Sequence, residues 1–140
     1  MEVLIIEDEK PSARRLKRML EKLDVTVKHT LHSVEESIQW FSNNPQPELI
    51  FLDIQLSDGL SFEIFDEVSI TSSIIFTTAY DEYALQAFKL NSIDYLLKPI
   101  DQEDLEKAVE KYKTFKPQQQ NVQLNFEDIK KMLTNPVERE

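Results

Sequence analysis

Cysteine is absent from the 140 residues of this chain. Its absence excludes disulfide bonds, zinc sites built from thiolates and catalysis by cysteine. Long apolar runs are missing too, since none approaches the ~20 residues that a membrane-spanning helix needs. The start of the chain shows no signal-peptide pattern. We therefore expect a cytoplasmic location, which agrees with the lack of cysteine.

Basic residues are in short supply. The chain has 16 Lys and Arg against 26 Asp and Glu, which gives a formal net charge of -10. Binding to a phosphate backbone depends mainly on Lys and Arg, so this segment is not expected to bind nucleic acid by itself. The acidic balance is compatible with a cation site. A hydrophobic content of 41% in a chain of this length predicts one globular domain with its own core.

The chain is organised around the stretch 49–53, in which four apolar residues run into Asp53. Pro45 and Pro47 precede this run, and Gly59, the only glycine, follows it. A short apolar run between turn signals predicts a strand that is buried on both faces. Because ligands of open parallel sheets bind outside the carboxyl ends of the strands, Asp53 is placed to act as a nucleophile or as a metal ligand.

Strand and helix patterns alternate along the chain. Strands are predicted at residues 1–6, 25–27, 49–53, 74–76 and 93–97. Helices are predicted at about 11–23, 33–43, 60–68 and 82–90, and after a cap at Asp101, with residues 54–59 as a loop. Five strands alternating with five helices predict an α/β fold, a doubly wound five-stranded parallel sheet covered on both faces.

The composition changes near residue 115. Residues 115–120 contain Pro117 and three glutamines without a hydrophobic period, which indicates a linker. Phe126, Ile129 and Leu133 then follow helical spacing, with Asn125 as a candidate cap. We therefore expect a domain at 1–114, followed at 115–140 by a linker with a short amphipathic helix.

The predicted strands deliver polar side chains to one edge of the sheet. These side chains are Glu7, Asp8, Asp53, Thr77, Thr78 and Lys98. Two unit charges about 4 Å apart repel by roughly 4 kcal/mol at an effective dielectric of 20, so three close carboxylates favour a divalent cation. A donor set of oxygens without cysteine favours Mg²⁺.

Lys98 and Thr78 offer a positive charge and a hydroxyl donor, which suit the oxygens of a phosphoryl group. A carboxylate can accept such a group, so the pattern predicts phosphoryl transfer onto Asp53. Each residue alone has an ordinary explanation: a solvated loop acid, a surface lysine or a helix cap. The joint pattern at successive strand ends carries the prediction.

These residues resemble the marker positions of a bacterial response-regulator receiver domain. The match consists of Glu7-Asp8, Asp53, Thr78-Ala79 and Lys98-Pro99, and it covers about residues 2 to 114. The runs 74–84 and 94–99 look like the LytTR-type (LytR/AlgR-like) subfamily, whose members carry a β-rich DNA-binding domain after the receiver. The resemblance implies a flavodoxin-like (βα)5 fold and a two-component signalling switch.

The resemblance also implies a role for each site residue. Asp53 would accept a phosphoryl group from a sensor histidine kinase. Mg²⁺ would be held by Asp8, Asp53 and the backbone carbonyl of Gln55, with Glu7 acting through water. Lys98 would pair with the phosphoryl oxygens, and the Lys98-Pro99 bond would be cis. Thr78 and Tyr95 would act in switching, and Gln55 and Tyr80 would tune dephosphorylation.

The implied partners follow from the same resemblance. Receivers of this subfamily are expected to form homodimers through the face of the fourth helix, the fifth strand and the fifth helix. Candidate contributors are Asp81, Glu82, Tyr83, Phe88, Lys89 and Lys107. DNA would be bound only through a C-terminal domain that this sequence lacks, and no membrane partner is expected.

Two other functions are weighed against this one. A Mg²⁺-dependent phosphatase with an aspartyl nucleophile needs an acid two residues after that nucleophile, where this chain has Gln55. An interaction module that works without phosphorylation typically lacks an acid or the lysine, and this chain keeps both. We therefore expect a receiver that modifies itself and is not a turnover enzyme.

The loop behind Asp53 departs from the family pattern. Ser57 stands where proline is common, and Gly59 comes early. The geometry of this loop is not predictable from the resemblance. We expect Asp58 to face solvent, the two histidines to be solvated or to cap a helix, and Trp40 to be buried or half-buried.

Overall fold

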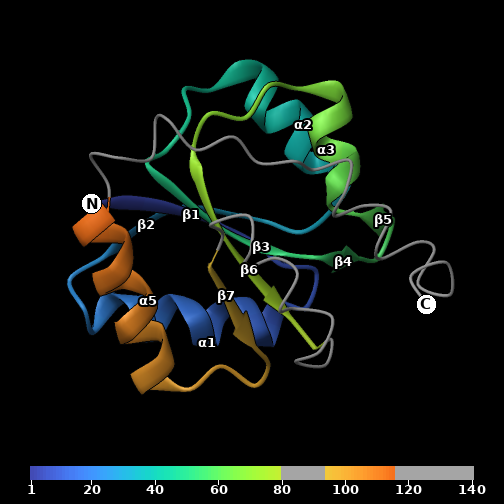
Figure 1. Ribbon diagram of the computed structural model, residues 1–140. Helices are drawn as coiled ribbons and strands as arrows, with labels where there is room; N and C mark the ends of the chain where they lie inside the picture. Colours follow the sequence, from blue (N-terminus) through green and yellow to red (C-terminus); the bar gives the residue numbers. More distant parts are fainter. Residues whose placement is uncertain (80–93, 116–140) are drawn as a thin grey trace, which may run out of the picture.

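The computed structural model describes residues 1–79 and 94–115 (Figure 1). Its strands are β1 (Glu2–Ile6), β2 (Thr26–Leu31), β3 (Leu49–Asp53), β4 (Gln55–Leu56), β5 (Gly59–Leu60), β6 (Ser73–Thr78) and β7 (Asp94–Leu97). Its helices are α1 (Lys10–Glu21), α2 (Val34–Asn43), α3 (Phe62–Glu67) and α5 (Gln102–Phe115).

Five strands form one parallel sheet in the order β2-β1-β3-β6-β7. β1 has β2 on one side and β3 on the other, so β1 and β3 are neighbours in the sheet although β2 lies between them in the sequence. Their carboxyl ends meet at the switch point, which is where open α/β sheets bind ligands. The predicted doubly wound parallel sheet is confirmed.

Alternate residues of the central strands face two separate cores. Val3, Ile5 and Phe51 pack on one side with residues of α1 and α5, while Leu4 and Leu52 pack on the other side with residues of α2 and α3. Figure 1 shows α1 and α5 on one face of the sheet and α2 and α3 on the opposite face. Burial on both faces explains why β1 and β3 read as continuous apolar runs.

Two helices begin where capping residues predict. The Ser33 hydroxyl accepts a hydrogen bond of 3.0 Å from the Glu36 amide at the start of α2. The Asp101 carboxylate accepts bonds from the first-turn amides of α5, at 3.2 and 3.4 Å. The inner face of α5 is buried and consists of Leu105, Ala108, Val109 and Tyr112. Trp40 is half-buried, as expected.

Three predicted segments differ clearly from the structure. Residues 54–59 are not a plain loop, since β4 and β5 form a small antiparallel hairpin there. The helix predicted at 60–68 is shorter, at 62–67, because residues 59 and 60 belong to β5. The strand predicted at 25–27 runs on to Leu31 as β2, paired with β1. As an edge strand it exposes Lys28 and His29, so its apolar pattern is weak.

Several predictions fall outside the described residues. They are the helix at 82–90, Tyr80, five of the six candidate dimer contacts, and the linker and helix beyond residue 115. Among the helices of the described ranges, none has the length and apolar character needed to cross a membrane.

Candidate functional site

Three carboxylates meet at the carboxyl ends of β1 and β3. Glu7 and Asp8 follow β1, and Asp53 is the last residue of β3. Glu7 and Asp53 are buried, with 4% and 6% of their surface exposed, and Asp8 is half-buried. One oxygen of each of these carboxylates lies within 4.8 Å of the others. The sheet register explains the convergence, because Ile6 pairs with Leu52 on the neighbouring strand.

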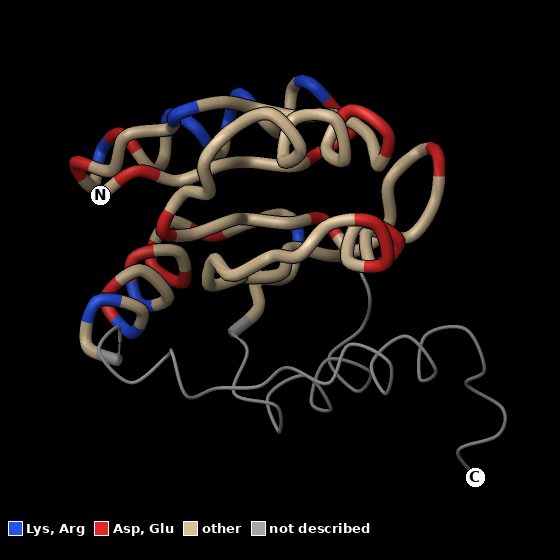
Figure 2. Tube along the Cα trace, turned by 90° about the horizontal axis from the view of Figure 1, so that it is seen from above, with Lys and Arg blue, Asp and Glu red and all other residues tan. Residues whose placement is uncertain are grey.

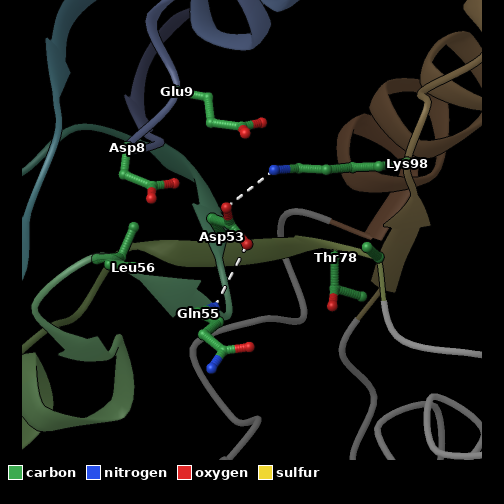
Figure 3. Close-up of a pocket in the computed structure, with 8 residues that line it drawn as sticks. Asp8, Glu9, Asp53, Gln55, Leu56, Thr78 and Lys98 are labelled. Carbon is green, nitrogen blue, oxygen red and sulfur yellow. Dashed lines mark hydrogen bonds and ion pairs between the residues drawn. The ribbon is translucent and has the colours of Figure 1, made fainter.

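Lys98 approaches the carboxylates from the opposite side. Its backbone follows β7, where the Lys98 amide donates to the Thr78 carbonyl at 2.8 Å, and the Lys98-Pro99 bond is cis as expected. Its ammonium lies 2.5 Å from Glu7 Oε1 and 2.8 Å from Asp53 Oδ2. Figure 3 shows Lys98 reaching across to Asp53. One cation therefore bridges two buried anions.

The charges in the pocket do not balance. The single ammonium of Lys98 lies beside the two buried carboxylates of Glu7 and Asp53, and half-buried Asp8 adds a third carboxylate. Burial raises the pKa of Glu7 to about 7, although hydrogen bonds from Lys98 and the Glu9 amide oppose the shift. Burial also raises the pKa of Asp53, against the opposing effect of Lys98. Burial lowers the pKa of Lys98, but its bonds to Asp53 and Glu7 outweigh that and raise it overall. A second cation would relieve the excess negative charge.

The other predicted site residues lie around the same pocket. Thr78, at the end of β6, is 2% exposed and lines the pocket with Asp8 and Asp53. Gln55 also lines it, and its amide donates to Asp53 Oδ1 at 3.4 Å (Figure 3). Tyr95 on β7 is half-buried and packs against the core under α2 and α3. Tyr80 lies outside the described residues.

Sequence reasoning missed two residues that line the pocket, Glu9 and Leu56, and it named Ala79 only as part of the marker pair Thr78-Ala79. Glu9 is the clearest of them, because its amide donates to Glu7 Oε2 at 3.0 Å and so orients that carboxylate. A signal for it was present, since Glu9 is the third acid in a row before α1. Leu56 carried no such signal, because its place depends on the hairpin fold.

The donor set fits a hard divalent cation of the Mg²⁺ kind. All three converging side chains offer carboxylate oxygens, and no sulfur is present in the pocket. Both oxygens of Asp53 already accept hydrogen bonds, from Lys98 on one side and Gln55 on the other. A carboxylate held in this way presents an oriented oxygen nucleophile beside a positive charge, which is suited to receiving a phosphoryl group.

Comparisons with known proteins agree with this geometry. A sequence profile of the family described as "Response regulator receiver domain" matches residues 3–110. The sensory transduction protein LytT of Bacillus anthracis is 39% identical over 123 residues, which is 85% of this chain and 50% of LytT. The transcriptional regulatory protein LytR of Staphylococcus aureus N315 is 35% identical over 125 residues, covering 86% and 50%. The chain thus spans about half the length of these curated relatives.

Solved structures share the fold. A two-component response regulator from Clostridium difficile superposes with a TM-score of 0.66 at 30% identity, covering 81% of this chain and 96% of that one. A CheY-like receiver domain from Methylobacillus flagellatus gives a TM-score of 0.62 at 23% identity, covering 79% and 97%. The second likeness speaks for the flavodoxin-like fold alone.

Proposed function

The chain belongs to the response regulator receiver domain family, and from that premise we propose that it is a signalling switch set by phosphorylation of Asp53. The observation that carries this proposal is the meeting of buried Asp53 with the Lys98 ammonium at 2.8 Å and with two further carboxylates within 4.8 Å.

The donor is proposed to be a phosphohistidine on a sensor histidine kinase. The N–P bond of the phosphohistidine breaks, and a bond forms between phosphorus and one carboxylate oxygen of Asp53, which gives an acyl phosphate. The histidine nitrogen keeps the electron pair and takes a proton from solvent. Lys98 stabilises the negative charge on the transferring oxygens, and the buried Thr78 hydroxyl is close enough to the pocket to donate to them.

Mg²⁺ is proposed as the resident cofactor. It would be held by Asp8, Asp53 and the Gln55 carbonyl, with Glu7 acting through water, and would neutralise charge on the phosphoryl oxygens. Glu7 and Lys98 already form an ion pair, so charge in the pocket can be redistributed when a second cation binds. Gln55 and Tyr80 are proposed to tune the hydrolysis of the acyl phosphate.

The output is proposed to follow from repacking of Tyr95 and Thr78, with homodimerisation through residues 82–90, β7 and α5. Lys107 is exposed on α5, where its ammonium lies 3.6 Å from Glu103. The domain boundary is proposed near residue 114, and a LytTR DNA-binding domain would complete the transcriptional regulator. This part rests on the relatives, which are about twice as long and include a transcriptional regulatory protein.

Intact mass measurement tests the proposal. The chain is incubated with Mg²⁺ and acetyl phosphate, and we expect one phosphoryl adduct on the wild type and none on Asp53→Asn. An adduct that persists in Asp53→Asn would refute Asp53 as the acceptor. No adduct on the wild type would also refute the assignment and would favour an interaction module independent of phosphorylation. Repeated turnover of a generic phosphomonoester would instead indicate a phosphatase.

A further inference from the structure

The turn that follows Asp53 in the sequence is hydrogen-bonded to the N-terminus of α2. In the β4–β5 hairpin, Leu56 pairs with Gly59, so Ser57 and Asp58 form a two-residue turn. The Asp58 carboxylate accepts two hydrogen bonds from the first backbone amides of α2, from Val34 at 2.8 Å and Glu35 at 3.1 Å.

Asp58 completes a helix end that α2 cannot satisfy alone. The first amides of a helix have no partner within it. Ser33 satisfies the amide of Glu36, and Asp58 supplies an oxygen to each of the two preceding ones. These bonds lower the pKa of Asp58, although partial desolvation opposes the shift. The contact is therefore a charge-assisted link between the hairpin turn and the N-terminus of α2.

The same hairpin carries the residues next to the phosphoryl acceptor. Gln55 begins β4, three residues before Asp58, and its amide bonds to Asp53 Oδ1. Leu56, 4% exposed, packs in the same core as Val34 of α2. A shift of Asp58 away from α2 would consequently move the backbone of Gln55.

The α2 end is in turn tied to β1. His32, just before α2, lies with its Nδ1 3.0 Å from the Glu7 carbonyl, and the Glu7 amide donates to the Leu31 carbonyl at 2.9 Å. Residues at or just before the start of α2 thus form hydrogen bonds both with the loop that carries Glu7 and Asp8 and with the hairpin that carries Gln55. Their relative position is set at the N-terminus of α2.

We propose that Asp58 is a positioning residue for cation binding, because its bonds to α2 hold the hairpin in which the Gln55 backbone lies beside Asp53. The proposal rests on the proposed function, in which the Gln55 carbonyl is a metal ligand. Asp58 itself does not contact the cation or the phosphoryl group. Its role depends on the hairpin geometry that follows from the early Gly59.

The test compares Asp58→Ala with a matched control, Ser33→Ala. Both changes remove capping acceptors from the same helix end, but only Asp58 links α2 to the hairpin. The Mg²⁺ dissociation constant is measured by titration calorimetry, and amide hydrogen exchange is followed over residues 54–60. We expect Asp58→Ala to raise the dissociation constant roughly tenfold, as loss of a supporting contact around a metal site does, and to speed exchange in the hairpin. Ser33→Ala should change neither.

Two further variants separate geometry from charge. Asp58→Asn loses the charge but keeps one acceptor oxygen, so it should bind Mg²⁺ more tightly than Asp58→Ala. Glu35→Gln removes a charge at the same helix end without touching the hairpin, and should bind Mg²⁺ as the wild type does. If Asp58→Ala does not fold, Asp58→Asn and Asp58→Ser take its place in the comparison.

Equal effects of Asp58→Ala and Ser33→Ala would overturn the inference, as would Mg²⁺ binding by Asp58→Asn that is no tighter than binding by Asp58→Ala. Failure of the proposed function would give a different experimental result from failure of this inference. In that case the wild type binds Mg²⁺ but gains no phosphoryl adduct, and the order of dissociation constants among the variants still decides the role of Asp58.

Discussion

Lys98 shows most directly how single residues set up the site. Its ammonium lies between Glu7 and Asp53, two carboxylates that are almost fully buried. Buried charges are stable only when they are paired. Lys98 therefore stabilises the carboxylates without metal, and it occupies the side of the pocket where a phosphoryl group would need a positive charge.

Lys98→Ala should separate these two effects. We expect phosphorylation of Asp53 by acetyl phosphate to slow by about 10²-fold, because the transferring oxygens lose a positioned positive charge. The same change should tighten Mg²⁺ binding, since the ammonium no longer competes for Asp53 and Glu7. Adduct formation by intact mass and calorimetry with Mg²⁺ provide the two readouts.

Lys111→Ala is the matched control, because it removes the same charge from an exposed position on α5. It should leave both readouts unchanged. An unchanged phosphorylation rate in Lys98→Ala would show that Lys98 does not act on the transferring group.

At the scale of elements, the β4–β5 hairpin connects the acceptor strand to α2 and α3. Asp58 bonds to the N-terminus of α2, and Glu63 of α3 accepts a bond of 3.2 Å from the Leu60 amide. The Ser61 amide donates to the Ile54 carbonyl at 2.8 Å. Two helices thus fix a hairpin that the sequence suggested only as a loop.

Gly59 allows this tight turn, and Gly59→Ala should destabilise the fold. Its φ of 147° is a conformation that L side chains rarely adopt, and an added Cβ would lie 2.5 Å from Glu63 Oε2. We expect a loss of about 1–3 kcal/mol in the free energy of unfolding, measured with urea. Glu63→Ala in the same chain relieves the contact but not the backbone conformation, so it should restore only part of the loss. Full restoration would contradict the backbone argument.

Asp58 gives α2 a stability that depends on pH. Because the folded-state pKa of Asp58 is lowered, its contribution is present above the unfolded value near 3.8 and is lost as the pH falls through the folded pKa. Asp58→Asn, which does not titrate, should lose less stability on acidification than the wild type. Thermal unfolding between pH 6 and pH 3 measures this difference. Parallel curves for the two proteins would rule out the effect.

At the scale of the whole molecule, one sheet separates two cores, and the acidic balance is spread over the surface. Figure 2 shows Asp and Glu positions along many parts of the described trace and not in one segment. Composition alone therefore does not mark the site. Burial does, because Glu7 and Asp53 are the only buried Asp or Glu residues among residues 1–79 and 95–114.

Phe51 lies at the centre of this architecture, fully buried on β3 between β1 and β6. Phe51→Ala should lower the free energy of unfolding by about 3–5 kcal/mol, through lost burial and the cavity left behind. Phe65→Ala, at a half-buried position on α3, should cost clearly less. Urea unfolding of both variants makes the comparison, and equal losses would place the main core elsewhere.

Much of the fold was predictable because local sequence encodes it. Continuous apolar runs identified β1 and β3, and capping residues identified the starts of α2 and α5. β2 was predicted too short, since an edge strand with exposed polar side chains lacks the apolar signal. The hairpin was missed because its strands are two residues long and form only through pairing with each other.

For the site, the sequence by itself determined which chemical groups follow which strand, because each group comes directly after an apolar run. Glu7, Asp8, Asp53, Thr78 and Lys98 could therefore be placed at one edge. Only the tertiary structure decided how these groups pair, since distances between residues far apart in the chain depend on packing. The Lys98 bridge, the link from Asp58 to α2 and the raised pKa of Glu7 all arise from contacts across the sheet that no local pattern specifies.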